Sequence, residues 1–343
     1  MEEKPMKAAI LRGSGQIEVV EMPVPEPGPG EVVIKVHYCG ICGSDIDAYE
    51  TGTYEPGLII GHEFAGEIVS TGERVYGLDV GDLVAVNSIV PCGMCYFCRH
   101  GMGGQCEDVI QPGVSHNGGM AEYAKVPAPA VHRLPAGMTT RQAVLTEPLG
   151  NALHAVRLSA LKPGDRALVM GAGPIGLLTL QCARLAGARE VYVTELSPTR
   201  ARLAAQLGAT MVLNPQKDNL FIALDEPTEG LGPDVIFVCA GVPAAIEDAI
   251  TLVRKGGQIV VVGIAEEPVT ADFMTVVLSE VSIKGSYGGY EEMPLALDFI
   301  AQGRVAVESL ISHEIALEDV VEQGFEMLTH PPHEAVKVLV KLP

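Results

Sequence analysis

The sequence has 343 residues, of which 48% are hydrophobic and 19% are charged, a balance that excludes a disordered or collagen-like chain. The 23 Lys and Arg against 43 Asp and Glu give a net charge of −20, which argues against proteins that bind nucleic acid or an anionic membrane. The start of the sequence carries no signal-peptide pattern, and no apolar run reaches the ~18–20 residues of a membrane span, so we expect a cytoplasmic protein.

The first third of the sequence is predicted to be rich in β-structure, because short alternating runs are separated by frequent Gly and Pro. Strands are expected at 31–38, 64–70 and 81–86. The Pro/Gly-rich segment 23–31 is interpreted as a turn rather than a linker, because the strand pattern resumes at once.

From about residue 151 strands and helices alternate, which implies a parallel sheet with helices on both faces. The expected strands are 166–171, 190–195, 234–241 and 256–264, with the last strand and its exit in 282–290, and the expected helices are 174–185, 197–208 and 243–254. A helix near 292–302 and a strand at 334–342 complete the chain.

A glycine pattern G-x-G-x-x-G, formed by Gly171, Gly173 and Gly176, lies between a predicted strand and a predicted helix. The first glycine permits the tight turn, the second lets the backbone approach a pyrophosphate, and the third allows close packing of helix on strand. The following helix N-terminus offers free N–H groups to the phosphates. We therefore expect a dinucleotide cofactor here.

The choice of dinucleotide depends on Glu195, which ends the second strand of this region. A carboxylate there accepts hydrogen bonds from ribose hydroxyls and repels a 2′-phosphate, so NAD is favoured over NADP. Arg200, five residues on, leaves NADP open as the weaker alternative.

Two groups of residues have metal-ligand character. Cys92, Cys95, Cys98 and Cys106 have the spacing C-x2-C-x2-C-x7-C, which suits a closed, structural zinc site. An iron–sulfur cluster also uses four thiolates, but the second cysteine group of a two-cluster ferredoxin is missing.

The second group is dispersed along the sequence and consists of Cys42, His62, Glu63 and Glu147. A thiolate, an imidazole and a carboxylate leave coordination positions open, as a catalytic zinc requires. Taken singly, Cys42 could belong to the core, and the two glutamates could be solvated. Cys39, three residues before Cys42, is interpreted as core.

The order of these motifs carries a family resemblance. GICGSD (40–45), GHEFAGE (61–67), the four-cysteine loop, GGMAEY (118–123), EPLGNALHAV (147–156) and GAGPIG (171–176) follow each other as in zinc-dependent medium-chain dehydrogenases/reductases. The sequence resembles most the sorbitol/polyol, butanediol and threonine dehydrogenase branches. The resemblance implies an α/β fold, with a GroES-like β-rich catalytic domain (1–150 and 289–343) and a Rossmann doubly wound parallel sheet (151–288).

The resemblance also implies roles at the metal site. Cys42 and His62 would bind zinc, and Asp45 would orient His62 through its other ring nitrogen. Glu63 would bind the metal directly or approach it when water leaves. Glu147 would bind the metal or act through its water.

The resemblance also implies that proton transfer begins at Ser44, which would receive the proton of the substrate hydroxyl. Many relatives place a histidine three residues further on, where this sequence has Asp47. Asp47 acting as a carboxylate base and an exit by another path both stay open.

The resemblance further implies cofactor contacts at the helix start and in loops that follow strands. These positions are Pro174, Ile175, Arg200, Val262, Gly263, Ile264, Ser286 and Tyr287. The segment 286–288 replaces an arginine-containing segment of the sorbitol enzymes, which weakens the case for sorbitol as substrate.

The function expected from these features is reversible oxidation of a secondary alcohol, a polyol or vicinal diol, with two zinc ions per chain and NAD. L-threonine 3-dehydrogenase is the alternative within the family, and a non-catalytic NAD-binding zinc protein is the alternative outside enzymes. A zinc-ribbon protein that binds nucleic acid would not explain the glycine pattern. The resemblance implies a homotetramer, or else a homodimer, and segment 281–286 is the expected edge where copies pair.

Overall fold

The computed structural model describes residues 5–265, 267–330 and 334–343. The chain divides into two compact units. The first comprises Met1–Glu147, Tyr290–Gly303 and Val307–Pro343, and the second comprises Pro148–Gly289 and Arg304–Ala306. Each unit has its own sheet and its own buried core.

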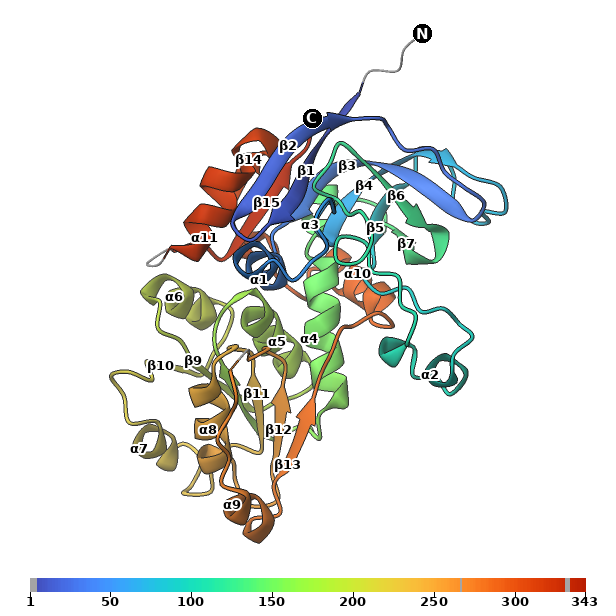
Figure 1. Ribbon diagram of the computed structural model, residues 1–343. Helices are drawn as coiled ribbons and strands as arrows, with labels where there is room; N and C mark the ends of the chain where they lie inside the picture. The colour runs from blue at the N-terminus through green and yellow to red at the C-terminus, as the bar shows by residue number, and fades with distance from the viewer. Residues whose placement is uncertain (1–4, 266, 331–333) are drawn as a thin grey trace. The chain divides into compact units, whose positions relative to one another are not determined.

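The first unit is built on a seven-stranded sheet of order β14-β15-β3-β4-β5-β7, with β6 also paired to β3, and on the hairpin β1-β2 (Figure 1). Its strands are β1 (Met6–Gly13), β2 (Gln16–Met22), β3 (Glu31–Gly40), β4 (Glu63–Thr71), β5 (Leu83–Val86), β6 (Tyr123–Pro127), β7 (Val131–Arg133), β14 (Ile311–Ala316) and β15 (Lys337–Lys341). Alternate residues of β3, including Val32, Ile34 and Val36, enter a core shared with Phe64 and Ile68 of β4.

Short helices connect these strands. They are α1 (Gly43–Thr51), α2 (Tyr96–Arg99), α3 (Thr140–Ala143), α10 (Met293–Ala301) and α11 (Met327–Thr329), with the 3-10 turns η1 (Gly103–Gln105), η2 (Ala128–Ala130), η3 (Glu308–Leu310) and η4 (Leu317–Asp319) and the π-helical η5 (Val320–Glu326). The longer α4 (Thr146–Leu158) begins at the end of this unit.

The register of three neighbouring strands fixes the place of the site. β3 and β4 are antiparallel and pair Gly40 with Glu63, while β15 is antiparallel to β3 and pairs Leu339 with Gly40. The end of β3, the start of β4 and the start of β15 therefore lie side by side at one end of these strands. Cys42, Glu63 and Lys337 all lie at this end of the strands.

The second unit is a six-stranded parallel sheet of order β10-β9-β8-β11-β12-β13 (Figure 1). Its strands are β8 (Arg166–Met170), β9 (Glu190–Thr194), β10 (Met211–Leu213), β11 (Val235–Val238), β12 (Gln258–Val261) and β13 (Ser282–Gly285), and its helices are α5 (Pro174–Leu185), α6 (Pro198–Gln206), α7 (Leu220–Asp225), α8 (Pro243–Leu252) and α9 (Phe273–Leu278). The strand order reverses between β8 and β11, and ligands of such sheets bind at the carboxyl ends of the strands beside this point.

The predicted fold class is confirmed, and so are the predicted strands and helices, whose ends shift by a few residues. The β1-β2 hairpin and the short strands β6, β7, β10 and β14 were not predicted from the sequence. The short helices α3, α7 and α9 and the long helix α4 were not predicted either. Strand β1 is buried over most of its length, so its sequence lacks the polar–apolar alternation of a half-exposed strand. No helix among residues 5–265, 267–330 and 334–343 has the length and hydropathy needed to cross a bilayer.

Candidate metal and cofactor sites

Three of the dispersed candidate ligands come together in the first unit. The Sγ of Cys42, a ring nitrogen of His62 and a carboxylate oxygen of Glu63 all lie within 4.8 Å of one another. Cys42 is the N-cap residue of α1, and the other two stand at the start of β4. Gly61 adopts φ +90°, and a Cβ there would lie 2.6 Å from the Sγ of Cys39. A glycine is therefore required directly before His62, and Cys39 belongs to the core, as expected.

Asp45 anchors this cluster from the first turn of α1. Its Oδ2 accepts a hydrogen bond from the backbone N–H of Cys42 at 3.0 Å, and its Oδ1 faces Nδ1 of His62 at 3.4 Å. Both side chains are buried. Burial alone would lower the pKa of His62, but the charges of Asp45 and Cys42 raise it above its ordinary range. A metal would therefore displace a proton from this histidine.

A buried ion pair adjoins the cluster. Nζ of Lys337 lies 2.8 and 2.7 Å from the two carboxylate oxygens of Glu63 and donates a third hydrogen bond to the carbonyl oxygen of Ile41 at 3.0 Å. Burial disfavours the ammonium, but the charges of Glu63, Cys42 and Glu147 and the hydrogen bond to Glu63 together outweigh it and raise the pKa of Lys337. Lys337 was not predicted as a site residue, although a lysine inside the apolar run 335–340 is a signal in the sequence.

Glu147 lies outside the compact group. It stands in the first turn of α4, where its buried Oε1 accepts a hydrogen bond from Ser88 Oγ at 2.6 Å. Burial raises the pKa of its carboxyl group, and the nearby charge of His62 opposes that rise. Direct binding of a metal by Glu147 stays a prediction.

Ser44 and Asp47 are one turn apart on α1, so their side chains leave the same face of the helix. Ser44 is partly buried, and Asp47 is exposed. Ser44 interacts with Tyr54, whose pKa rises to about 12 because of burial and the charge of Asp45. Tyr54 was not anticipated, since it lies in an irregular loop without a motif.

The set of Cys42, His62 and Glu63 fits zinc, which prefers sulfur and nitrogen donors and accepts carboxylates. Its donor atoms are already close, two of its three residues are buried, and a set of three leaves a position for substrate.

The four-cysteine loop fits zinc by the distances between its sulfur atoms. Sulfur atoms at the corners of a tetrahedron with Zn–S bonds of ~2.3 Å lie about 3.8 Å apart. The Sγ atoms of Cys95 and Cys98 are 3.5 Å apart, those of Cys95 and Cys106 are 3.9 Å apart, and those of Cys92 and Cys98 are 4.0 Å apart. Backbone N–H groups of Met94 and Cys95 point at Cys92 and lower its pKa, which favours the thiolate.

The glycine pattern of the second unit forms the turn between β8 and α5. Gly171 has φ +96°, and a Cβ on Gly176 would lie 1.8 Å from the carbonyl oxygen of Gly171. A Cβ on Gly173 would meet no atom within 4 Å, so the backbone here is open to a ligand. Gly173 is the N-cap of α5 and Pro174 is its first residue, with Ile175 next. The loop therefore fits a pyrophosphate at a helix N-terminus.

Glu195 follows β9 and faces this loop. Its Oε2 accepts a hydrogen bond from Ala172 N–H at 2.7 Å, and its Oε1 accepts from Leu196 and Ser197 N–H at 2.8 and 2.7 Å. These bonds hold a carboxylate beside the glycine turn. Arg200 is partly buried in the first turn of α6.

The other predicted cofactor residues follow the carboxyl ends of β12 and β13. They are Val262, Gly263, Ile264, Ser286 and Tyr287. A Cβ on Gly263 would lie 2.7 Å from the carbonyl carbon of Ala240, so only glycine fits between these strand ends. All five lie on the side of the sheet where such folds bind ligands.

Comparison with known proteins decides the family. The family model described as an alcohol dehydrogenase GroES-like domain matches residues 28–136, and the one described as a zinc-binding dehydrogenase matches residues 174–302. The (R,R)-butanediol dehydrogenase of Bacillus subtilis is 36% identical over 98% of this chain and 99% of its own length. The chain belongs to the zinc-dependent medium-chain dehydrogenases.

Two further relatives show the breadth of this dehydrogenase family. The L-threonine 3-dehydrogenase of Pyrococcus horikoshii is 35% identical over 96% of both chains. The crystal structure of a zinc-binding dehydrogenase from Sinorhizobium meliloti bound to NADP has a TM-score of 0.93 at 32% identity, and the match covers 99% of this chain and 100% of that chain. The protein is therefore an oxidoreductase of the alcohol and polyol type that uses NAD(P), and these relatives leave its substrate open.

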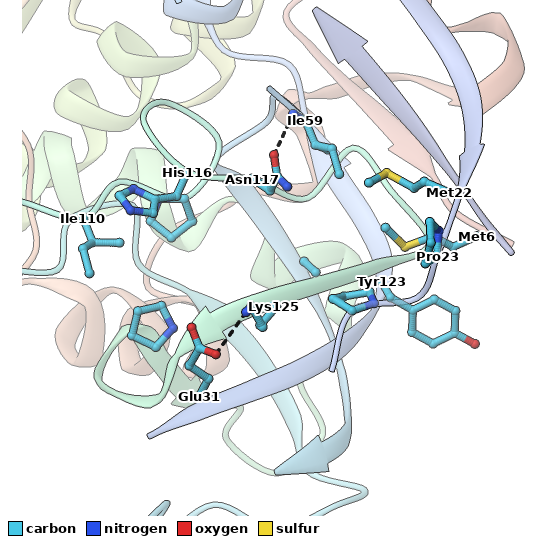
Figure 2. A pocket seen from close by; sticks show the side chains of 15 residues that line it. Met6, Met22, Pro23, Glu31, Ile59, Ile110, His116, Asn117, Tyr123 and Lys125 are labelled. Carbon is cyan, nitrogen blue, oxygen red and sulfur yellow. Dashed lines mark hydrogen bonds and ion pairs between the residues drawn. The ribbon is translucent and has the colours of Figure 1, made fainter. Parts of the chain in front are cut away.

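This dehydrogenase also has a pocket of about 340 Å³ in the first unit (Figure 2). Apolar side chains such as Met6 and Met22 line it together with the ion pair Glu31–Lys125, at 3.2 Å. None of the residues that line it belongs to the predicted ligand or cofactor sets. The chemistry of the family is therefore assigned to the candidate ligands Cys42, His62 and Glu63 and not to this pocket.

Proposed function

We propose that this enzyme reversibly oxidises a secondary alcohol, a polyol or a vicinal diol, to the ketone with NAD. The observation that carries this proposal is the group of a partly buried thiol, a buried imidazole and a buried carboxylate, whose donor atoms lie within 4.8 Å of one another. A protein that only bound NAD would have no use for such a set beside a separate four-cysteine site.

Zinc held by Cys42 and His62 would act as a Lewis acid on the substrate hydroxyl, and NAD would accept the hydride. Asp45 orients the ring of His62 from its Nδ1 side, so that Nε2 is the nitrogen presented to a metal. Glu147 is held by Ser88 and is available as a further ligand or as a base toward water.

Ser44 is the proposed first acceptor of the hydroxyl proton. It interacts with Tyr54, and its partly buried position connects the cluster with the exposed face of α1. Asp47, one turn on and exposed, would pass the proton to water. Replacing Ser44 by alanine should cost more activity than replacing Asp47 by asparagine.

Glu195 supports NAD as the preferred cofactor. Three backbone N–H groups hold its carboxylate beside the glycine turn, where a 2′-phosphate would meet a negative charge. The Sinorhizobium meliloti relative is bound to NADP, so a preference of this enzyme for NADP is the alternative that a comparison of the two cofactors has to exclude.

L-threonine oxidation is the second candidate, supported by the stretch PLGNALH (148–154) and by the threonine dehydrogenase among the relatives. A panel of polyols, vicinal diols and L-threonine, followed by the absorbance of reduced nicotinamide, separates the candidates. Turnover of a polyol or diol with kcat/KM at least tenfold above that of threonine supports the first; the reverse ranking supports the second.

The enzyme is further proposed to form a homo-oligomer, a homotetramer or homodimer. Strand β13 is exposed over its whole length at the edge of the second sheet, and Ile283 within it is 41% exposed. Helix α9, just before it in the chain, exposes four large apolar side chains: Phe273, Met274, Val277 and Leu278. An open edge beside apolar surface is what a second copy would cover.

A further inference from the structure

The pocket of the first unit (Figure 2) combines a buried apolar floor with an exposed rim that carries the polar groups. The floor consists of its buried lining residues Met6, Ile59, Pro112, Gly118 and Ala124, and the rim of its exposed lining residues Pro23, His116, Asn117 and Lys125. Small-molecule sites have this arrangement, because apolar surface supplies most of the binding energy and a few polar groups fix the orientation of the ligand.

The volume of the pocket limits the size of a ligand. About 340 Å³ lies near the lower end of the ~300–1,000 Å³ that small-molecule pockets have. It equals the space that about eleven water molecules occupy in the liquid. A compact organic molecule of roughly ten non-hydrogen atoms fits this space, whereas a dinucleotide cofactor is several times too large.

The charges at the pocket come from one ion pair. Glu31 and Lys125 are the only Asp, Glu, Lys or Arg residues among the described residues that line it. Oε2 of Glu31 lies 3.2 Å from Nζ of Lys125 and accepts a hydrogen bond from the N–H of Gly28 at 2.8 Å. The charge of Glu31 is therefore compensated, whereas the ammonium has three N–H donors and its pair with Glu31 uses one of them.

The ion pair can also be rearranged. The side chains of Lys125 and Glu31 are 40% and 31% exposed, and an ion pair with this much contact with water contributes little to stability. Lys125 can therefore turn toward a second carboxylate inside the pocket without a large loss of stability.

Asn117 supplies another hydrogen-bond donor. Its Oδ1 accepts a hydrogen bond from the backbone N–H of Ile59 at 3.1 Å, which assigns the other end of the amide as the NH₂ group. Figure 2 shows Asn117 and Lys125 on opposite sides of the pocket. An amide NH₂ group and an ammonium donate hydrogen bonds and accept none, so the rim favours a ligand whose head group accepts them.

We propose that this pocket binds a small monocarboxylate, whose carboxylate pairs with Lys125 and whose apolar body covers Met6 and Ile59. A purely apolar molecule leaves the donors of the rim without partners, and a cation meets the charge of Lys125. A phosphate ester brings two negative charges to one lysine that already adjoins Glu31. The inference goes beyond the proposed function and does not depend on it, because the residues that line the pocket are separate from the predicted ligand and cofactor sets.

Octanoate is the probe, and NMR of protein labelled at the methionine methyl groups reports its binding at this pocket without any measurement of activity. The signals of Met6 and Met22, assigned with Met6→Leu and Met22→Leu, should shift with a Kd of about 1 mM or lower. Met211 lies in β10 of the second unit, and its signal should stay in place. Octan-1-ol and octylammonium have the same apolar body with other head groups, and both should bind about fivefold or more weakly than octanoate.

Three variants test the head group. Lys125→Met should weaken octanoate binding about fivefold or more, because the carboxylate loses its cation. Glu31→Gln keeps an acceptor for Gly28 but removes the competing charge, so it should strengthen octanoate binding about twofold or more. Lys7→Met is the matched control, since Lys7 also pairs with a glutamate at the surface, Glu318 at 2.6 Å, but does not line the pocket. It should bind octanoate like the wild type.

Met6 and Met22 signals that stay in place at ~10 mM octanoate overturn the proposal, even if octanoate inhibits turnover, because it then binds elsewhere. Binding of octan-1-ol or octylammonium as tight as that of octanoate overturns the assignment to carboxylates. A folded Lys125→Met protein with wild-type affinity for octanoate does the same. If Lys125→Met does not fold, Glu31→Gln decides, and octanoate binding that is unchanged or weaker in that variant overturns the proposal.

Discussion

Two glycines of one turn, three residues apart, should respond to the same substitution in opposite ways. Gly176→Ala places a Cβ 1.8 Å from the carbonyl oxygen of Gly171, far inside the 3.0 Å that such atoms keep. Gly173→Ala places a Cβ where no atom lies within 4 Å, in a backbone with φ −66° that alanine adopts freely. The first change therefore damages the fold, and the second damages only the approach of a ligand.

The magnitudes follow from these contacts. Overpacking against rigid backbone costs about 3 kcal/mol, and the better helix propensity of alanine returns about 1 kcal/mol, so Gly176→Ala should lose about 2 kcal/mol. A loss of this size lowers the melting temperature of the second unit by roughly 4–8 °C. For Gly173→Ala, the poorer N-cap costs up to about 1 kcal/mol and the restricted unfolded chain offsets about 0.4–1 kcal/mol, so stability should hardly change.

Thermal unfolding without cofactor and fluorescence titration with NADH measure the two effects separately. Gly173→Ala should melt like the wild type and bind NADH about tenfold or more weakly, because its methyl group stands where a pyrophosphate would approach the backbone. Gly176→Ala should lose both stability and binding. A Gly173→Ala protein that binds NADH with wild-type affinity would refute the placement of the cofactor in this turn.

Three further predictions concern the metals, the cofactor and the assembly. Elemental analysis should find two zinc ions per chain. Cys95→Ser should lower the melting temperature, whereas Cys42→Ser should stay folded and lose turnover. If both variants merely unfold, the basis for separate structural and catalytic sites is lost. Glu195→Ala should reduce the preference for NAD over NADP by about tenfold, because the charge that repels the 2′-phosphate is gone; equal kcat/KM for both cofactors in the wild type contradicts this. Light scattering should show an oligomer that Ile283→Lys dissociates into smaller species, since a charge would then lie on the exposed edge strand; a monomeric wild type contradicts it.

The sequence predicts the second unit well because its physics is local. Buried strands appear as short apolar runs, and Gly and Pro mark the ends of the helices that follow them. The glycine turn was predictable for the same reason, since each glycine has a steric role within a few residues of chain. The four cysteines of 92–106 likewise lie in one short loop.

The first unit is harder to predict, because its site is made by pairing of strands distant in sequence. Lys337 meets Glu63 only because β15 pairs with β3 and β3 with β4, and the sequence holds no spacing rule that connects residues 274 positions apart. Tyr54 reaches Ser44 from a loop without regular structure. The resemblance named the expected ligands, but the contacts that orient them required the fold.

The central claim is that hydride passes from a secondary carbinol carbon to the nicotinamide ring in a reaction that needs Cys42. The most direct measurement uses a polyol or vicinal diol deuterated at the reacting carbon and follows the label into the reduced cofactor by mass spectrometry. We expect the zinc-loaded wild type to transfer the deuterium and Cys42→Ser, folded and with its four-cysteine zinc retained, to transfer none. Label transfer at an undiminished rate by Cys42→Ser, or none from any secondary alcohol with the zinc-loaded wild type, would contradict it.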